Sequence, residues 1–303
     1  MRTLKVRSST GDQIFDAFNI LFMLGLVVMV LYPVFNVIAV SFSDALNVGR
    51  GKITFYPRGF TTEAYDHILK DSTVWVGYRN SIFYSLSSTF IMLLLTSTFA
   101  YPLAIQGFTL KKPLTVFLAV TMFISGGLIP TFLLIRNIGW INSPLAIIIP
   151  GTVGAWNVFI FRTFFKSIPA ELIESAKMDG ANDYRILFGI VLPLSKALLA
   201  TFGLFGIVGM WNSWFSALIY LTDANLHPLQ LILREYLYVV TVQQMEARAG
   251  MGGGASNPAL IQQLTPRSVQ MAMVVVTMFP IMVIYPFFQK YFVKGVMIGA
   301  IKG

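Results

Sequence analysis

The sequence predicts an all-α, polytopic membrane protein with six transmembrane helices, and three observations support this. Hydrophobic residues make up 56% of the 303 residues, charged residues only 12%, and the mean hydropathy is +0.71. These proportions are unlike those of water-soluble domains. The apolar residues also gather in runs of about 20, the helical length that crosses a bilayer core about 30 Å thick. This length leaves no room for a large soluble domain such as a fused ATPase.

Six apolar runs mark the expected spans. The first, at about 18–40, is too long for the apolar region of a signal peptide and lacks a small-residue cleavage site, so we expect it to be retained. The others lie at about 82–106, 113–135, 143–164, 188–220 and 269–289. We expect residues 1–303 to form a single transmembrane domain, with long external loops at about 41–78 and 221–267.

The distribution of basic residues predicts the orientation. With the N-terminus inside, 13 of the 22 Lys and Arg residues fall in cytoplasmic segments. Because cytoplasmic loops of membrane proteins are enriched in Lys and Arg, we expect both termini in the cytoplasm. The formal net charge of +9 fits this asymmetry, and nothing resembles a nucleic-acid-binding module, so no nucleic-acid partner is expected.

Several functional classes lack their residues in this sequence. There is no Cys, and the two His residues, His67 and His227, fall in expected external loops and are interpreted as surface residues. A metal centre or catalytic triad is therefore not expected. No phosphate-binding loop of the form G-x-x-x-x-G-K-(S/T) is found, so another chain would have to hydrolyse ATP. The apolar cores hold no Asp, Glu or His, which argues against an intramembrane enzyme or a proton-coupled carrier.

The polar segment between the fourth and fifth spans predicts a short surface helix. Ser167 and Pro169 suit a helix start, and Glu171 and Glu174 place negative charge in its early turns. Gly180 is a natural left-handed stop.

One face of this helix is narrow and mostly small. Ala170, Ile173 and Ala176 recur every three residues, and small side chains allow another surface to approach closely. The helix would either dock on a partner or lie on lipid headgroups. Further along, Pro193 predicts a kink near the start of the fifth span.

The segment at about 165–190 resembles a known motif. Glu174-Ser175-Ala176, Asp179-Gly180-Ala181 and Ile190-Val191-Leu192-Pro193 stand at the spacing of the EAA motif of permease subunits in bacterial ABC importers, with Ser175 where that family commonly has Ala. The resemblance implies a type I ABC importer permease fold with a cytoplasmic coupling helix that inserts into a cleft on an ATPase subunit. It implies the following coupling residues: Glu174, Ser175, Ala176, Asp179, Gly180, Ala181 and Pro193.

Two further segments extend the resemblance over nearly the whole chain. The ending Gln289–Gly303 is similar to that of carbohydrate-uptake class 1 permeases, as is the external run Phe55–Thr61 followed by Asn80-Ser81. The ending and the long loop before the last span look most like the subgroup for oligosaccharides and polysaccharides. The resemblance therefore implies a non-catalytic permease subunit for carbohydrate import in the bacterial inner membrane.

The resemblance also implies an assembly. The partners would be a second, different permease subunit, two ATPase subunits and an extracytoplasmic solute-binding protein that delivers the carbohydrate. This chain would bind no cofactor, because ATP and magnesium would bind to the ATPase subunits.

Aromatic and amide side chains within two spans are candidates for contact with sugar. Trp211, Asn212 and Trp214 lie in the fifth span, and Trp156 and Asn157 in the fourth. Aromatic rings stack on the apolar faces of sugars, and amides bond their hydroxyls. The alternative is that each Trp marks a membrane interface and each Asn bonds a neighbouring helix.

The third span and the function each leave alternatives open. Ser125–Pro130 interrupts the third span, either as a packing bend or as a bend that lines the path. A permease for another small solute such as glycerol phosphate would carry the same coupling motif. An ATP-independent secondary carrier belongs to a different class, and a structural scaffold would leave the docking helix unexplained.

Overall fold

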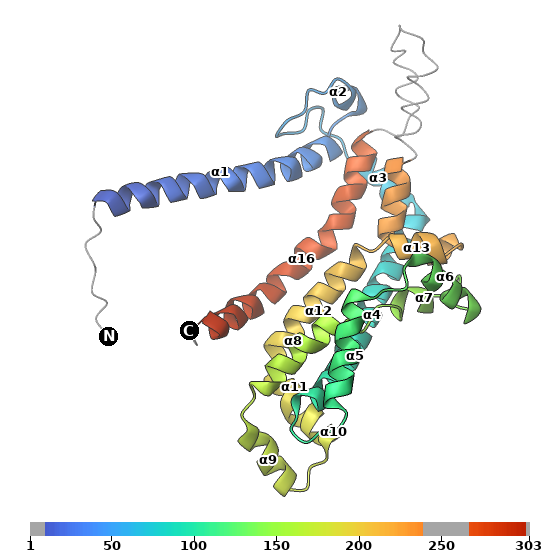
Figure 1. Ribbon diagram of the computed structural model, residues 1–303. Coiled ribbons are helices and arrows are strands. Elements are labelled where there is room, and N and C mark those ends of the chain that lie inside the picture. Colours follow the sequence, from blue (N-terminus) through green and yellow to red (C-terminus); the bar gives the residue numbers. More distant parts are fainter. Residues whose placement is uncertain (1–9, 239–266, 301–303) are drawn as a thin grey trace. The chain divides into compact units, whose positions relative to one another are not determined.

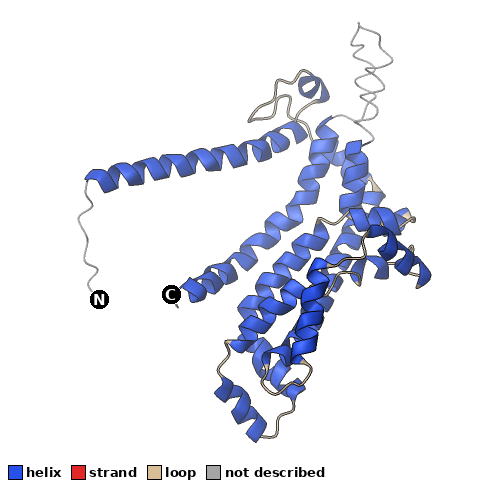
Figure 2. Cartoon of the chain, in the orientation of Figure 1, coloured by secondary structure: helices blue, strands red, loops and turns tan. Residues whose placement is uncertain are grey.

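The computed structural model describes residues 10–238 and 267–300, and the side chains of the last helix up to Phe287. The described residues form helices joined by turns, and none of them forms a strand (Figure 2). A single antiparallel bridge pairs Ser43 with Phe60. The all-α prediction is confirmed. Most of the external loop expected at 221–267, namely residues 239–266, lies outside the described residues.

The chain divides into two compact units, each described by itself. The first comprises residues up to Lys70 together with Tyr236–Val276, and the second comprises Asp71–Glu235 together with residues from Thr277 onward. The expected single domain stays a prediction.

The first unit contains α1 (Thr10–Ser41), α2 (Ala45–Gly49), α3 (Glu63–Lys70) and the beginning of α16 (Arg267–Ala300). Its small core consists of Ala39, Val40, Val48 and Ile53. Asn36 at the end of α1 donates hydrogen bonds from Nδ2 to the carbonyls of Ile53 (3.2 Å) and Thr54 (2.9 Å). The chain after α1 is therefore folded back onto the helix by polar contacts as well as by its core.

The second unit is organised around α4 (Ser72–Ala104), against which α8 (Ala155–Lys166) and α12 (Lys196–Trp211) pack (Figure 1). Small residues permit a close approach between α4 and α12. A Cβ added at Gly206 would lie 2.8 Å from both Met92 Cε and Thr89 Oγ1 of α4. In helix pairs within membranes, such glycines let the backbones approach. Deeper in the same unit, the rings of Phe161 and Phe202 meet edge to face, 5.0 Å apart.

The third and fourth expected spans are each broken. In place of one helix over 113–135, α5 (Lys111–Phe123) and α6 (Leu128–Asn137) meet at an angle of 115°. The break falls within the predicted interruption, where Gly127 adopts φ +81°. The fourth segment forms the four-residue α7 (Leu145–Ile148), a turn, and then α8.

The fifth span is bent as Pro193 predicts, and the bend lies two residues later. It begins with α10 (Asp183–Ile186), the π-helix η1 (Leu187–Val191) and α11 (Leu192–Leu194), and these turn by 82° into α12. Ser195 lies at the bend and donates from Oγ to the carbonyl of Val191 (2.7 Å). The same carbonyl also accepts the N–H of Ser195 (3.0 Å), so both polar groups of Ser195 bond the last residue of the π-helix at the bend. The unit continues through α13 (Phe215–Tyr220), the 3₁₀ turn η2 (Ala224–Leu226) and the helical residues 229–235.

Three helices in the described ranges are long and apolar enough to cross a membrane, namely α1, α4 and the part of α16 from Arg267 to Phe287. The number rises to five if each bent pair is one span. The 12-residue α8 is short for a crossing, since an α-helix rises about 1.5 Å per residue. The count of six spans stays a prediction.

Candidate functional site

The predicted surface helix is present as α9 (Ala170–Met178), which lies between α8 and α10 at one end of the second unit (Figure 1). Pro169 precedes its first turn, and Gly180 follows it with φ +79°. The N–H groups of Ala181 and Gly180 donate to the carbonyls of Ala176 (2.9 Å) and Lys177 (3.0 Å). This pair of bonds is a Schellman motif, which requires a left-handed residue best supplied by glycine. The predicted start at Pro169 and stop at Gly180 are confirmed.

Ser167 does not start this helix. Its hydroxyl donates to the carbonyl of Phe164 (2.7 Å) and so satisfies the end of α8. Pro169 takes the position before α9 with no side-chain hydrogen bond. The two helices are therefore separated by a sharp turn.

The small face of α9 points inward, so the expectation that it receives another surface is wrong for two of its three residues. Ile173 and Ala176 are partly buried and pack against the core cluster that contains Phe165, Ile186 and Leu187. The opposite face is open, with Leu172 45% and Met178 88% exposed. The three-residue repeat predicts which residues share a face of the helix, but it does not predict whether that face packs on the rest of the chain or on a partner.

The predicted coupling residues occupy three settings. Glu174, Ser175, Asp179 and Gly180 are exposed. Ala176 and Ala181 are partly buried against the core. Pro193 is exposed but lies in α11, beyond the π-helix and outside the α9 segment.

One polar chain connects α9 to α4. Lys177 Nζ lies 4.0 Å from Asp183 Oδ1, and the hydroxyl of Tyr101 donates to that same oxygen at 3.2 Å. The Lys177–Asp183 pair is solvent-exposed, so its contribution to stability is small. Asp183 of α10 is therefore the shared partner of Lys177 in α9 and of Tyr101 near the end of α4.

The candidate sugar residues fall into two groups. Trp211 is 3% exposed and donates from Nε1 to the carbonyl of Thr277 (3.2 Å). Asn212 is exposed and accepts a hydrogen bond from Gln230 (3.2 Å), and the ring of Trp214 lies 4.6 Å from the guanidinium of Arg234.

The second group lies at the start of α8. There Trp156 is 64% exposed and Asn157 is partly buried. Within residues 10–238, no hydrogen bond or ring contact joins this pair to Trp211, Asn212 or Trp214. Contact of either group with sugar stays a prediction.

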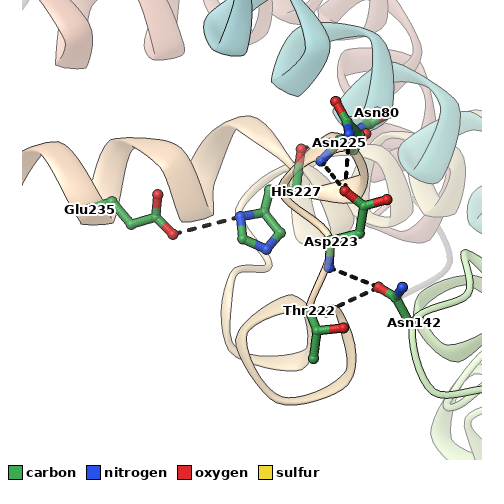
Figure 3. Close-up of polar contacts among 7 residues, drawn as sticks. All are labelled: Asn80, Asn142, Thr222, Asp223, Asn225, His227 and Glu235. Atoms are coloured by element: carbon green, nitrogen blue, oxygen red, sulfur yellow. Dashed lines mark hydrogen bonds and ion pairs between the residues drawn. The ribbon is translucent and has the colours of Figure 1, made fainter.

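A polar clamp, defined as Asn80, Ser81, Tyr84 and Asn142 with the segment 222–229, lies elsewhere in the second unit. Figure 3 draws Asn80 and Asn142 with part of this segment. Asn80 Nδ2 donates to the carbonyls of Asn225 (2.8 Å) and His227 (3.0 Å). Ser81 Oγ accepts the N–H of Leu229 (2.8 Å), and Tyr84 donates to the carbonyl of Leu226 (2.9 Å). Three side chains on two adjacent turns of α4 thus hold the loop between α13 and the next helix.

Asn142 holds the same loop from the other side. Its backbone is left-handed, with φ 58°, and its Oδ1 accepts the N–H groups of Thr222 (3.1 Å) and Asp223 (2.9 Å). Asn tolerates this conformation better than other side chains do. The residue was not predicted from the sequence, in which only an Asn before Ser-Pro hinted at a turn.

His227 is not the surface residue expected. Its side chain is only 16% exposed, and Nδ1 lies 3.6 Å from Glu235 Oε1 (Figure 3). His67, by contrast, is exposed as expected. Among the described residues, no group of three or more His, Asp or Glu could hold a metal ion.

Comparison with known proteins decides the family. Residues 5–298 match the profile of the binding-protein-dependent transport system inner membrane component. The chain belongs to this family. Its members are permease subunits of ABC transporters, so the protein is a transport component of the inner membrane.

Similar proteins extend over almost the whole permease. Protein LplC of Bacillus subtilis is 34% identical over 98% of each chain. The polygalacturonan/rhamnogalacturonan transport system permease protein YtcP of the same organism is 35% identical over 96% of this chain and 99% of its own. A chain in the crystal structure of a bacterial ABC transporter involved in the import of the acidic polysaccharide alginate is 29% identical. It superposes with a TM-score of 0.83 over 95% of this permease and 100% of its own length. The type I importer permease fold is confirmed.

Proposed function

We propose that this permease is one transmembrane subunit of an ATP-driven, binding-protein-dependent importer of an oligosaccharide or polysaccharide. Coupling to an ATPase is supported by one observation: α9 is an exposed helix that ends in a Schellman motif, and its residues stand at the EAA spacing. The cargo is supported by the similarity, over nearly the full chain, to the polygalacturonan/rhamnogalacturonan permease YtcP and to a chain of the alginate importer.

The rest of the assembly supplies what this chain lacks. A second, different permease completes the translocation path, and an extracytoplasmic binding protein delivers the carbohydrate. Two ATPase subunits bind ATP and magnesium, and this chain binds no cofactor. The chain crosses the membrane six times, with α9 and both termini in the cytoplasm and with α7 and α8 forming the short fourth crossing.

Coupling begins at the exposed face of α9. Closure of the ATPase subunits moves the helix, and the packing of Ile173 and Ala176 transmits that movement to the core of the second unit. The contact from Lys177 through Asp183 to Tyr101 gives a second route to α4. The 82° bend before α12 turns this displacement toward the path.

Four of the candidate sugar residues have side chains that are exposed or partly exposed, namely Trp156, Asn157, Asn212 and Trp214. In the proposed path these four contact the carbohydrate. Trp211 is buried, so it fixes the end of α12 on which Asn212 and Trp214 stand.

Copurification tests the coupling. The tagged wild-type permease is expected to bring down an ATPase, and Glu174→Lys or Gly180→Pro is expected to lose it or to uncouple hydrolysis from uptake. Glu63→Lys is the matched control, because it makes the same charge change on α3 in the other unit. If wild type carries no ATPase and uptake continues without ATP, the chain is a secondary carrier.

Uptake assays test the cargo. Cells with the complete importer are expected to take up acidic or neutral oligosaccharides, and Asn157→Ala and Asn212→Ala are expected to change the rate or the range of sugars. Uptake of glycerol phosphate but no oligosaccharide would refute the carbohydrate assignment and leave the coupling intact.

A further inference from the structure

A pocket of about 420 Å³ lies between α9 and the ends of the helices that support it. Its polar lining includes Lys111, Lys166, Lys177 and Glu174. Its apolar lining includes Phe165 and Ile168. Three lysines face one glutamate, so the lining carries an excess of positive charge.

Two basic side chains are held here by backbone carbonyls: Lys111, which lines the pocket, and Arg162, which does not line it but is close enough to Lys111 for their charges to interact. Lys111 Nζ donates to the carbonyl of Ile105 (3.0 Å), and Arg162 Nε donates to the carbonyl of Leu103 (3.1 Å). These carbonyls belong to the end of α4, where unpaired carbonyls favour positive charge. Both cations are therefore tied to the same helix end.

These cations repel one another and lack acidic partners. Lys111 is close enough to Lys166 and Arg162 for their charges to interact unfavourably. In the described part of the chain, Lys111, Lys166 and Arg162 have no carboxylate within 4.0 Å. Lys177, by contrast, has Asp183 at that distance. An anion placed among them would relieve this repulsion.

We propose that this pocket binds the phosphate headgroup of an anionic phospholipid. Lys111 and Lys166 contact the phosphate, and Phe165 and Ile168 contact the glycerol and the first methylenes of the acyl chains. The site lies where the apolar helices α4, α5 and α8 begin or end, the level at which headgroups meet a membrane protein. Basic pockets between membrane helices bind lipid headgroups in this way, and the apolar wall favours a lipid over a free ion.

The position of the pocket gives the lipid a role in coupling. Ile173, Glu174 and Lys177 line it from α9, whereas Lys111 and Lys166 line it from neighbouring helices. A bound headgroup therefore bridges α9 to the helices that it moves. This inference rests on the proposed function only in placing α9 at the membrane surface, and it does not depend on the cargo.

Native mass spectrometry of the complete importer tests the site. The complex is purified from mixed phosphatidylcholine and phosphatidylglycerol, and the phosphatidylglycerol that stays bound is counted. Lys111→Gln with Lys166→Gln is expected to reduce retention by at least about tenfold, because each lysine at a membrane surface contributes about 1 kcal/mol. Lys112→Gln is the control, since this neighbouring lysine is exposed and does not line the pocket.

Three outcomes would overturn the proposal. Equal retention by the wild type and the double variant would show that the lipid binds elsewhere. Displacement of phosphatidylglycerol by millimolar inorganic phosphate would indicate a free-anion site. Retention only after removal of the ATPase subunits would assign the pocket to them. Lys111→Arg with Lys166→Arg is expected to retain the lipid, which separates lost charge from lost folding, and copurification of the ATPase reports separately on the proposed function.

Discussion

Asn80 and Asn142 hold the loop at 222–229 with paired hydrogen bonds to backbone groups, whereas α9 has no buried residue and is attached by partial apolar contacts and one exposed ion pair. Both regions belong to the second unit. Two hydrogen bonds from one side chain fix both the position and the orientation of a loop. A few apolar contacts fix position loosely and allow a helix to shift as a body. The clamp is thus suited to keep a surface in place, and α9 to transmit movement.

Removal of Asn80 should have the largest effect on stability. Asn80 is 6% exposed and its amide donates to two carbonyls, so Asn80→Leu leaves both without that partner. We expect a loss of about 2–3 kcal/mol in the free energy of unfolding, measured by denaturant titration in detergent. Asn225→Ala is the control, because it keeps the backbone carbonyl that Asn80 binds and removes only the exposed hydrogen bond from Asn225 Nδ2 to Asp223 Oδ1 (3.0 Å). Equal losses in the two variants would show that the clamp is not what holds the loop.

Sequence reasoning succeeded where structure depends on neighbours along the chain. The Gly180 stop and the bend near Pro193 follow from local backbone rules, and both are present. The clamp could not be predicted, because Asn80 and its acceptor Asn225 are 145 residues apart. The inward face of α9 was missed for a related reason, since Ile173 and Ala176 bury against helices whose placement no local pattern reveals.

Asn142 allows the strain and the hydrogen bonds of the clamp to be separated. Asn142→Ala loses two hydrogen bonds and puts at φ 58° a residue that tolerates the left-handed region less well than Asn does, so we expect a cost of about 2 kcal/mol. Asn142→Gly loses the same bonds without the strain and should cost about 1 kcal/mol less. Thermal unfolding of the two variants measures this difference. If they unfold together, the left-handed backbone contributes nothing to the stability of the clamp.

Gly180→Val should separate stability from coupling. Valine at φ +79° costs about 1–2 kcal/mol locally, which frays the end of α9 more than it unfolds the unit. We expect ATP hydrolysis to continue with several-fold less uptake per ATP. Gly189→Ala is the matched control, since a Cβ there meets nothing within 4 Å and φ is not left-handed. Normal uptake per ATP in Gly180→Val would mean that the end of α9 does not transmit movement.

The smallest stability effect is expected at the link between α9 and α4. Lys177 and Asp183 are 48% and 59% exposed and 4.0 Å apart, so Lys177→Met should change the free energy of unfolding by less than about 0.5 kcal/mol. Asp183→Asn keeps an acceptor for Tyr101 and should also unfold normally, whereas Asp183→Leu removes that acceptor. The stabilities of these two variants should differ little. If α9 acts through this link, uptake per ATP falls in Asp183→Leu and is largely kept in Asp183→Asn. Equal uptake in both would leave the apolar contacts of Ile173 and Ala176 as the route from α9, and the looseness of its attachment would then be the property that coupling uses.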